Sequence, residues 1–426
     1  MRFVLASYGG RGDVEPAVVV GRELVQRGHD VCLAVPPNLV GFTETAGLAA
    51  VAYGLDSRPI LELQRKYWRC YFGTPWRLKE LNSMGRETEK FATQCWGEMT
   101  ATLTSVADGA DLLLTGLIFE QPAANAAEYH DIPLATLHFF PVRAHGQLLP
   151  FLPSPLSRTL MTVNEWLVWR GTRKDEDAQR RELGLTRATG PAPRRIAERG
   201  SLEIQAYDEV YFPKLASEWA KRARRQALNR PFVGALAMEM PTNADEQVAS
   251  WIAAGKPPIC FGFGSVPVES PADTIAMIAG ACAQLGERAL VCSGGTDFSD
   301  FPHAEHVKVV GVVNYATIFP ACRAVVHHGG AGTLAACLRA GVPQLILWTL
   351  PDQPFFAAQL KRLKVGRGRR FSTTTQKTLV ADLRRILTQQ YVASAGQIAT
   401  RITEPTKSAM AAADLVEDFA RLKRIG

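Results

Sequence analysis

Apolar and polar residues follow two different periods along this chain. Short runs of consecutive apolar residues, typical of strands buried on both faces of a parallel sheet, are separated by stretches with apolar residues three or four positions apart, typical of amphipathic helices. In the first 140 residues the predicted strands are 3–7, 31–35, 112–114 and 134–137, and the predicted helices are 16–27 and 121–129. This alternation predicts an α/β domain with a parallel sheet.

The second half of the chain repeats this alternation. Its predicted strands are 259–263, 289–292, 307–310, 324–327 and 345–347, and its predicted helices are 272–285, 333–340 and 408–424. Prolines and glycines punctuate a basic stretch at residues 211–240, where we expect the junction of two Rossmann-like domains. The predicted organisation is an N-terminal domain at residues 1–225, a C-terminal domain at 226–407 and a final helix at 408–426.

Two segments interrupt the alternation. Residues 57–92 mix six aromatic residues with basic ones, and residues 140–175 are rich in Pro, Leu and Trp. We expect both to be irregular insertions that wall an acceptor pocket. The aromatic-basic part, residues 67–79, has two interpretations. It either contacts a lipid-like acceptor or a membrane surface, or it is a loop with packed aromatics and solvated charges.

Bulk properties are those of a globular protein. The 426 residues are 47% hydrophobic and 21% charged, and no apolar run reaches the roughly 18 to 20 residues of a membrane span. The N-terminus does not resemble a signal peptide, so we expect a cytoplasmic location. The eight cysteines lack Cys-x-x-Cys spacing, which favours reduced thiols. The net charge of +7 comes without a nucleic-acid recognition motif, so nucleic acid is not an expected partner.

Residues 324–333, AVVHHGGAGT, are the most informative segment. A helix that begins directly after glycines presents unpaired N–H groups and the positive end of its dipole, which suits a phosphate or diphosphate. The predicted helix ends before Gly341, which permits a left-handed cap, and Pro343 blocks its continuation. No lysine of the P-loop type and no nearby acidic metal ligand accompany the turn. The segment therefore predicts a diphosphate site that works without magnesium.

Three segments together resemble the donor-binding signature of the GT-B glycosyltransferases of family 1. They are HGGAGT at residues 328–333, AGVPQ at 340–344 and DQP at 352–354. The opening segment SYGGRGDVEP at residues 7–16 resembles the bacterial antibiotic and sterol-type branch of that family, and the chain is particularly similar to mycobacterial enzymes that glycosylate glycopeptidolipids. The resemblance implies the α/β GT-B fold: two Rossmann-like domains that face each other across a cleft, with the C-terminal helix crossing back to the N-terminal domain.

The resemblance also implies an activity, namely inverting, metal-independent transfer of a sugar to a hydroxyl of a hydrophobic acceptor. The donor implied is a nucleoside-diphosphate sugar such as dTDP-rhamnose, with UDP-sugars also possible, and no cofactor is implied. The acceptor implied is the glycopeptidolipid core, with possible peripheral contact at the inner membrane. Sterol or small-molecule glucosylation with UDP-glucose is the alternative.

Asp13 is the predicted catalytic base. It follows the first strand, at the carboxyl edge of the predicted sheet, where a carboxylate can accept the proton of an attacking hydroxyl. Its other interpretation is a helix N-cap before Val14, Glu15 and Pro16. From the residues alone both stay open, and the resemblance favours catalysis. His138 is a weaker candidate as a partner of Asp13 or as part of the acceptor pocket.

The resemblance assigns the remaining site residues. His328 and the N–H groups of residues 330–333 would stabilise the departing diphosphate, while Asp352 and Gln353 would bind sugar hydroxyls. Strand alternation instead predicts that His327 packs under the sheet. The predicted donor-binding residues are Arg11, Gly12, Ser265, Val313, His328, Gly329, Gly330, Ala331, Gly332, Thr333, Asp352 and Gln353. The predicted acceptor-binding residues are His138, Tyr67, Trp68 and Trp76.

Three other functions fit the sequence less well. A dehydrogenase would need a third glycine after Gly10 and Gly12 and an acidic residue after the second strand, where Val35 is followed by two prolines. A sugar-nucleotide epimerase shares the double-Rossmann organisation, but the Asp352–Gln353 pair favours transfer. A non-catalytic sugar-nucleotide or lipid-binding protein would need a damaged base or donor site, and neither is damaged here.

Overall fold

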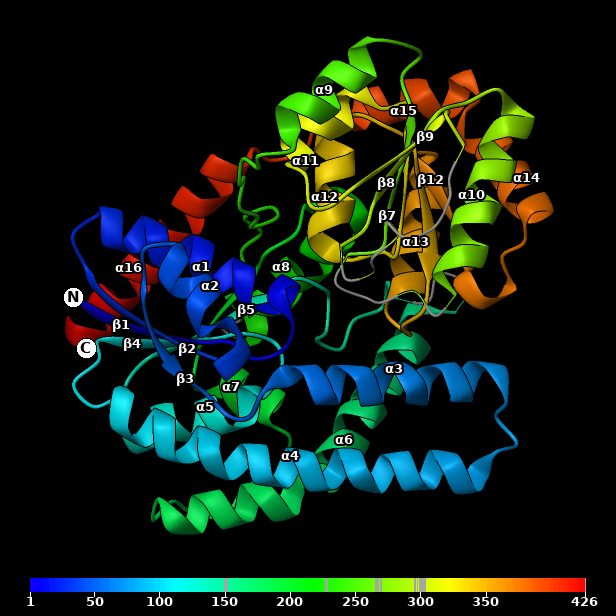
Figure 1. Ribbon diagram of the computed structural model, residues 1–426. Coiled ribbons are helices and arrows are strands. Elements are labelled where there is room, and N and C mark those ends of the chain that lie inside the picture. The colour runs from blue at the N-terminus through cyan, green and yellow to red at the C-terminus, as the bar shows by residue number, and fades with distance from the viewer. Residues whose placement is uncertain are drawn as a thin grey trace. The chain divides into compact units, whose positions relative to one another are not determined.

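The computed structural model describes residues 1–148, 152–226, 229–264, 268, 270–294, 296, 298 and 304–425. The chain forms two compact units. The first comprises Met1–Ala237 and Thr403–Gly426, and the second comprises Met238–Ile402. Each unit is a parallel sheet covered by helices (Figure 1). No helix within the described ranges is both long and apolar enough to cross a bilayer.

The first unit contains a six-stranded sheet in the order β3-β2-β1-β4-β5-β6. All of its strand pairs are parallel. Its strands are β1 (Arg2–Ala6), β2 (Asp30–Val35), β3 (Ala49–Ala52), β4 (Leu112–Thr115), β5 (Leu134–His138) and β6 (Leu202–Gln205). Its helices are α1 (Arg11–Gln26), α2 (Val40–Thr45), α3 (Ser57–Gly73), α4 (Leu78–Val106), α5 (Glu120–Tyr129), α6 (Ser154–Glu182), α7 (Ala192–Glu198), α8 (Leu215–Gln226) and α16 (Pro405–Ile425). The strand order reverses between β1 and β4, so ligands are expected at the carboxyl ends of these two strands.

The second unit has the same topology, with the sheet order β12-β11-β10-β7-β8-β9. Its strands are β7 (Ile259–Gly262), β8 (Ala289–Cys292), β9 (Val307–Val310), β10 (Ala324–His327), β11 (Gln344–Trp348) and β12 (Gly366–Arg370). Its helices are α9 (Asp245–Ala253), α10 (Pro271–Leu285), α11 (Tyr315–Ile318), α12 (Ala331–Arg339), α13 (Gln353–Leu363), α14 (Gln376–Ile386) and α15 (Gln389–Ala399). Here the strand order reverses between β7 and β10. The glycine turn directly follows β10.

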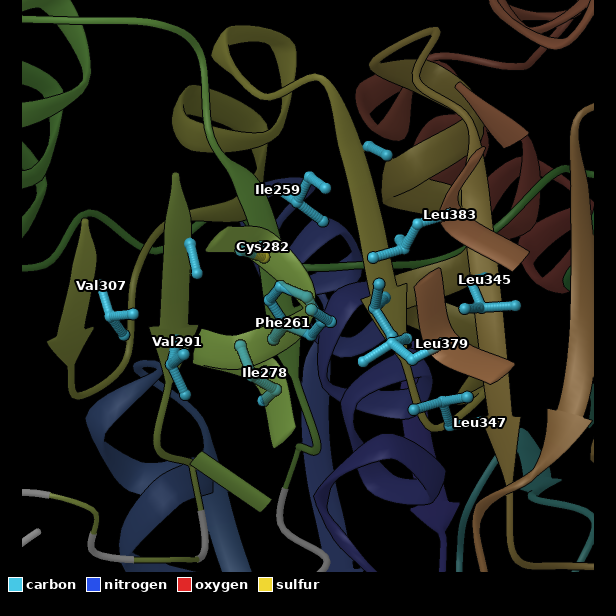
Figure 2. Close-up of a cluster of buried hydrophobic side chains, with 14 of the residues drawn as sticks. Ile259, Phe261, Ile278, Cys282, Val291, Val307, Leu345, Leu347, Leu379 and Leu383 are labelled. Carbon is cyan, nitrogen blue, oxygen red and sulfur yellow. The ribbon is translucent and has the colours of Figure 1, made fainter. Parts of the chain in front are cut away.

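The core of the second unit lies between its sheet and the helices α10 and α14. Phe261, Val291 and Leu345 project from three strands toward Ile278 of α10 and Leu379 of α14 (Figure 2). All five side chains are buried. This packing holds the strands in register, and it thereby sets the positions of the turns that follow them.

Helix α16 packs against α1 of the first unit. A polar cluster joins the two segments: Arg27 Nη1 lies 2.6 Å from Asp414 Oδ1, and His29 Nε2 lies 2.8 Å from Glu417 Oε1. The expected return of the C-terminal helix to the N-terminal domain is therefore confirmed.

The predicted strands are confirmed, but the sequence missed β3, β6 and β12. All three stand at an end of the strand order of their sheet. Their sequences carry little pattern: AAVA is mostly alanine, LEIQ alternates apolar and polar residues, and GRGRR contains only glycine and arginine. Strands at the edge of a sheet tolerate small or charged residues, so their hydrophobic pattern is weak. The predicted reduced state of the cysteines is consistent with the structure, in which all eight are free thiols.

Three predictions about local structure were wrong. Helix α1 begins at Arg11 rather than Pro16, because Gly10 provides its N-cap. Residues 57–92 are not irregular, since they form α3 and most of α4. Residues 140–175 include much of the long helix α6 rather than only loop. The helices α3, α4 and α6 were missed because their outward faces also carry large apolar residues. Apolar residues on both faces obscure the spacing that marks an amphipathic helix.

Candidate active site

The carboxyl end of β1 leads into a tight turn that carries Asp13. Gly9 has a φ of +128°, and a Cβ atom there would lie 2.4 Å from Asp13 Oδ2, so the turn requires glycine. Asp13 is the third residue of α1, and its Oδ2 accepts the backbone N–H of Gly10 at 2.7 Å. The Ser7 hydroxyl donates to the Asp13 carbonyl oxygen at 2.8 Å.

This geometry combines the two interpretations of Asp13. The side chain does cap α1, although from the third helical position rather than as the N-cap residue. It also stays partly exposed, and it lies at the reversal between β1 and β4 that binds ligands in open α/β sheets. A carboxylate held rigidly by a backbone N–H and open to solvent suits a general base.

Phe119 stands at the neighbouring strand end. It precedes α5 with a φ of 60°, a left-handed conformation that is costly for a bulky residue. Its partly exposed ring packs edge-on against Tyr8, with ring centroids 5.3 Å apart, and against Trp96 at 6.2 Å. The aromatic group therefore forms a wall beside the turn of Asp13.

His138 lies within a buried ionic network. Its Nε2 is 2.6 Å from Glu120 Oε1, and Arg143 contacts both Glu120 and Glu203. Burial, reinforced by the Arg143 guanidinium, lowers the pKa of His138. Burial opposes ionisation of Glu203, but the guanidinium groups of Arg143 and Arg230 lower its pKa to about 2. His138 is fully buried, so the structure places it behind the site rather than on an exposed pocket wall.

In the second unit, His328 lies between two glycine turns. A Cβ atom on Gly264, after β7, would lie 2.6 Å from His328 Cε1, and one on Gly330 would lie 2.6 Å from His328 Nε2. The His328 ring is partly exposed, but its Nδ1 atom is buried. Burial lowers the pKa of His328 to about 4, and a hydrogen bond to the Gly262 backbone only partly opposes this shift, so the ring is neutral near pH 7. A neutral imidazole that is partly exposed beside a glycine turn can form a hydrogen bond to a ligand.

The glycine turn itself is held by His327. Its Nδ1 accepts the backbone N–H of Gly329 at 3.2 Å, and its Nε2 lies 3.0 Å from Gln344 Oε1 on β11. These partners assign the proton to Nε2, so His327 must be neutral. Burial lowers its pKa to about 3. The prediction that His327 packs under the sheet is confirmed, and the structure adds its role in shaping the turn.

Gly329 has a φ of +100°, and a Cβ atom there would come within 2.9 Å of Ile346 and 3.1 Å of Gln353. Helix α12 begins at Ala331 directly after this turn, so its first N–H groups lie at the ends of β10 and β7. Ala331, Gly332 and Thr333 form its first turn, as the predicted diphosphate site requires.

Asp352 and Gln353 begin α13, directly beside this turn. The Gln353 Oε1 atom accepts the backbone N–H groups of Thr349 at 2.7 Å and Leu350 at 2.9 Å. The amide therefore has only its NH₂ group left to offer a ligand. Asp352 is partly exposed, and burial raises its pKa. The pair presents one acceptor and one donor, which suits sugar hydroxyls.

The other predicted residues are spread over several elements. Val313 is buried behind β9, whereas Val312 is 56% exposed and faces outward. Arg11 and Gly12 are exposed at the start of α1, where the Arg11 guanidinium lies 4.8 Å from the centre of the Phe42 ring. Ser265 lies outside the described residues. The structure places Tyr67 and Trp68 on α3 and Trp76 in the connection to α4.

Comparison with known proteins agrees with this architecture. Residues 289–417 match the family model described as the C-terminal domain of erythromycin biosynthesis protein CIII-like proteins. An uncharacterized glycosyltransferase of Mycobacterium tuberculosis (strain ATCC 25618 / H37Rv) is 59% identical over 427 residues, covering 100% of both chains. This chain belongs to the glycosyltransferases. The vancomycin aglycone glucosyltransferase of Amycolatopsis orientalis is 27% identical, over 98% of this chain and 97% of its own.

Solved structures show that the glycosyltransferase has the GT-B fold. The calicheamicin glycosyltransferase CalG4 superposes with a TM-score of 0.71 at 17% identity, covering 98% of each chain. The glycosyltransferase VinC in complex with dTDP gives a TM-score of 0.65 at 19% identity over 100% of both chains. The predicted fold class is thereby confirmed.

Sequence reasoning missed two residues that shape the candidate site of this glycosyltransferase. The role of His327 depends on Gln344, which is 17 positions away and becomes its neighbour only through the pairing of β10 with β11. The left-handed conformation of Phe119 has no signature in the sequence, because bulky residues rarely adopt it. The one nearby signal is the adjacent Glu120, whose carboxylate belongs to the buried ionic network around His138.

The state of His327 predicts a pH dependence of stability for the glycosyltransferase. Its pKa is about 3 in the folded protein and near 6.5 in an unfolded chain. Between these two pH values the His327 side chain is protonated in the unfolded chain but neutral in the folded protein. The free energy of unfolding therefore falls as pH falls below 6.5, by up to about 1.4 kcal/mol per pH unit from His327. Denaturant unfolding between pH 7.5 and pH 5 measures this slope.

His327→Asn provides the comparison. An asparagine oxygen can still accept the Gly329 N–H but does not titrate. We expect the variant to be less stable at neutral pH, because the contact with Gln344 is lost, and to lose less stability on acidification. Parallel slopes in the two proteins would contradict the assigned state of His327.

Proposed function

We propose that this glycosyltransferase moves a hexose or deoxyhexose from a nucleoside diphosphate to a hydroxyl of a hydrophobic acceptor, with inversion and without a metal ion. The observation that carries the proposal is the turn between β10 and α12. Gly329 is held there by His327, the partly exposed His328 ring lies beside Gly330, and a helix begins immediately afterwards. Such a turn suits a diphosphate leaving group.

On the donor side, the N–H groups of α12 and the imidazole of His328 supply hydrogen bonds to the diphosphate. Charge increases on the departing phosphate oxygen in the transition state, so donors fixed before reaction stabilise that state more than the ground state. These groups replace the charge that a metal ion would provide. The Asp352 carboxylate and the Gln353 NH₂ group bind and orient the sugar hydroxyls.

On the acceptor side, Asp13 accepts the proton of the attacking hydroxyl. The oxygen forms a bond to the anomeric carbon as the bond from that carbon to the diphosphate breaks. Because attack and departure occur on opposite faces, one displacement inverts the anomeric centre. The Tyr8 and Phe119 rings offer apolar surface to the acceptor beside this base.

Donor and acceptor identity follow from resemblance. We propose a dTDP-deoxyhexose such as dTDP-rhamnose and a glycopeptidolipid acceptor, as the likeness to mycobacterial glycopeptidolipid glycosyltransferases implies. VinC was solved with dTDP, and a spinosyn rhamnosyltransferase shares the fold with a TM-score of 0.61. The second candidate is glucosylation of a small molecule, which the 27% identity to the vancomycin aglycone glucosyltransferase favours.

Thermal unfolding with UDP, dTDP or GDP, without and then with magnesium, tests the donor site. A ligand at one hundred times its Kd stabilises the native state by about 2.7 kcal/mol, which raises the melting temperature. We expect the largest shift with dTDP and no further shift on adding magnesium. Absence of any shift would contradict the donor site, and a shift that requires magnesium would contradict metal independence.

A further inference from the structure

The connection between α3 and α4 forms an ordered tip. The two helices pack side by side, and in Figure 1 they extend away from the strands of their sheet to a common end. At that end the Thr74 N–H donates to the Cys70 carbonyl oxygen at 2.7 Å, and the Arg77 N–H donates to the Thr74 carbonyl oxygen at 2.9 Å. The side chains of this tip are therefore presented in a defined arrangement.

Large apolar side chains at the tip face solvent. Trp76 is 73% exposed, Leu78 is 64% exposed and Tyr71 is 48% exposed. The aromatic rings of α3 also contact one another: Tyr67 stacks on Tyr71 with centroids 6.4 Å apart, and Trp68 stacks on Phe72 at 5.8 Å. Tyr67, Trp68 and Phe72 are partly buried, so the outward aromatic surface of this segment consists mainly of Tyr71 and Trp76.

The same tip is basic. Every charged residue from Leu63 to Lys79 is an arginine or lysine: Arg65, Lys66, Arg69, Arg77 and Lys79. The flanking acids are Glu62, which pairs with Arg65 at 2.6 Å, and Glu80, which pairs with Arg77 at 3.2 Å. Glu62 also lies 3.6 Å from the Lys66 amine. The five cations outnumber these two acids, so the tip keeps a net positive charge.

The tip is distant from the turn of Asp13. Helix α3 begins beside that turn, since a Cβ atom on Gly10 would lie 3.4 Å from Leu61 Cδ1. From Leu61 to Gly73 the helix rises by roughly 18 Å at about 1.5 Å per residue. Trp76 is therefore too far along the hairpin to contact the reacting hydroxyl, so its exposure calls for a different partner.

We infer that this tip docks on the surface of an anionic lipid bilayer. Tryptophan and tyrosine favour the interface between headgroups and acyl chains, and arginine and lysine are attracted to anionic headgroups. The exposed aromatic residues of the tip suit the boundary between headgroups and acyl chains, and its positive charges suit the anionic headgroups. The contact would hold the turn of Asp13 near lipid-borne acceptors, but it does not depend on the transfer chemistry.

Co-sedimentation of the full chain with vesicles tests the inference. Vesicles of equal parts phosphatidylglycerol and phosphatidylcholine are compared with pure phosphatidylcholine, at low and high salt. We expect binding to the anionic vesicles that weakens with salt. Trp76→Ser with Leu78→Ser, and separately Arg77→Gln with Lys79→Gln, should each weaken it by about ten-fold or more.

Matched variants elsewhere in the first unit provide the controls. Tyr129→Ser removes an aromatic residue that is 46% exposed, and Arg194→Gln with Lys407→Gln removes two cations whose side chains are 74% and 70% exposed. These variants should bind like the original chain. Melting temperatures of the tip variants should stay near that of the original chain, because the replaced side chains are exposed.

Three results would overturn the inference. The first is no sedimentation of the original chain with anionic vesicles. The second is equal binding by the tip variants, which would place any lipid contact elsewhere, for example on the exposed apolar face of α6. The third is a change in oligomeric state in the tip variants with unchanged vesicle binding, which would make the tip an interface between copies.

Discussion

Asp13→Asn should reduce transfer by roughly 10²- to 10⁴-fold while the protein remains folded, because an amide cannot take the proton of the acceptor hydroxyl. The structure makes this substitution informative. An asparagine oxygen can still accept the Gly10 N–H that Asp13 Oδ2 accepts at 2.7 Å, so the cap of α1 survives. Turnover of donor and acceptor, measured beside the melting temperature, separates chemistry from capping.

Asp13→Ala completes this test, because it removes both the base and the cap. We expect it to lose about 1 kcal/mol of stability in addition to activity. Glu23→Gln is the control, since Glu23 lies on the same helix and its partly buried side chain pairs with Arg27 rather than with the turn of Asp13. If Asp13→Asn transferred sugar at the original rate while Asp13→Ala did not, capping alone would explain Asp13.

His328→Ala should weaken the binding of nucleoside diphosphates by about 10- to 150-fold. This range corresponds to the roughly 1.5–3 kcal/mol of a hydrogen bond to a charged group. The partly exposed imidazole lies between Gly264 and Gly330 just before α12, so a diphosphate bound at the start of that helix would lie within its reach. Titration calorimetry with dTDP or UDP measures the change.

The corresponding nucleosides separate this role from a general disturbance of the site. Thymidine and uridine lack phosphate, so His328→Ala should leave their affinity unchanged. His306→Ala is a matched control in the same unit, because His306 bonds to the Ala279 carbonyl oxygen at 3.0 Å, far along the sheet from β10. Equal diphosphate affinity in the original chain and His328→Ala would contradict the proposed role.

Regular structure was predictable wherever interactions are local. Buried strands such as β4 and β10 begin with three consecutive apolar residues, and the end of α12 is marked by Gly341 with a φ of +68°. The alternation of strands and helices then indicated parallel sheets. The edge strands β3, β6 and β12 and the α3–α4 hairpin were not predicted, because they carry polar, small or outward-facing aromatic residues whose surroundings the chain alone does not specify.

The candidate site was predictable only in part. The residues of the β10–α12 turn are contiguous, so a glycine turn before a helix indicated an anion site directly. By contrast, the Gln353 side-chain oxygen accepts two backbone N–H groups, so only the NH₂ group of this side chain is left to bind a sugar. Hydrogen bonds of this kind depend on how one loop folds back on itself, and residue types do not specify that.

By itself, the sequence indicated two alternating α/β halves, a glycine turn at His328 and Gly329 that suits a diphosphate, and a carboxylate after the first strand. These features depend on residues within a few positions of one another. The tertiary structure decided that His327 shapes the turn through Gln344, that Asp13 caps its own helix while staying open to solvent, and that Trp76 faces water. The cap at Asp13 is a local contact with Gly10. The contact between His327 and Gln344 and the exposure of Asp13 and Trp76 depend on how distant segments pack together, and no local pattern records them.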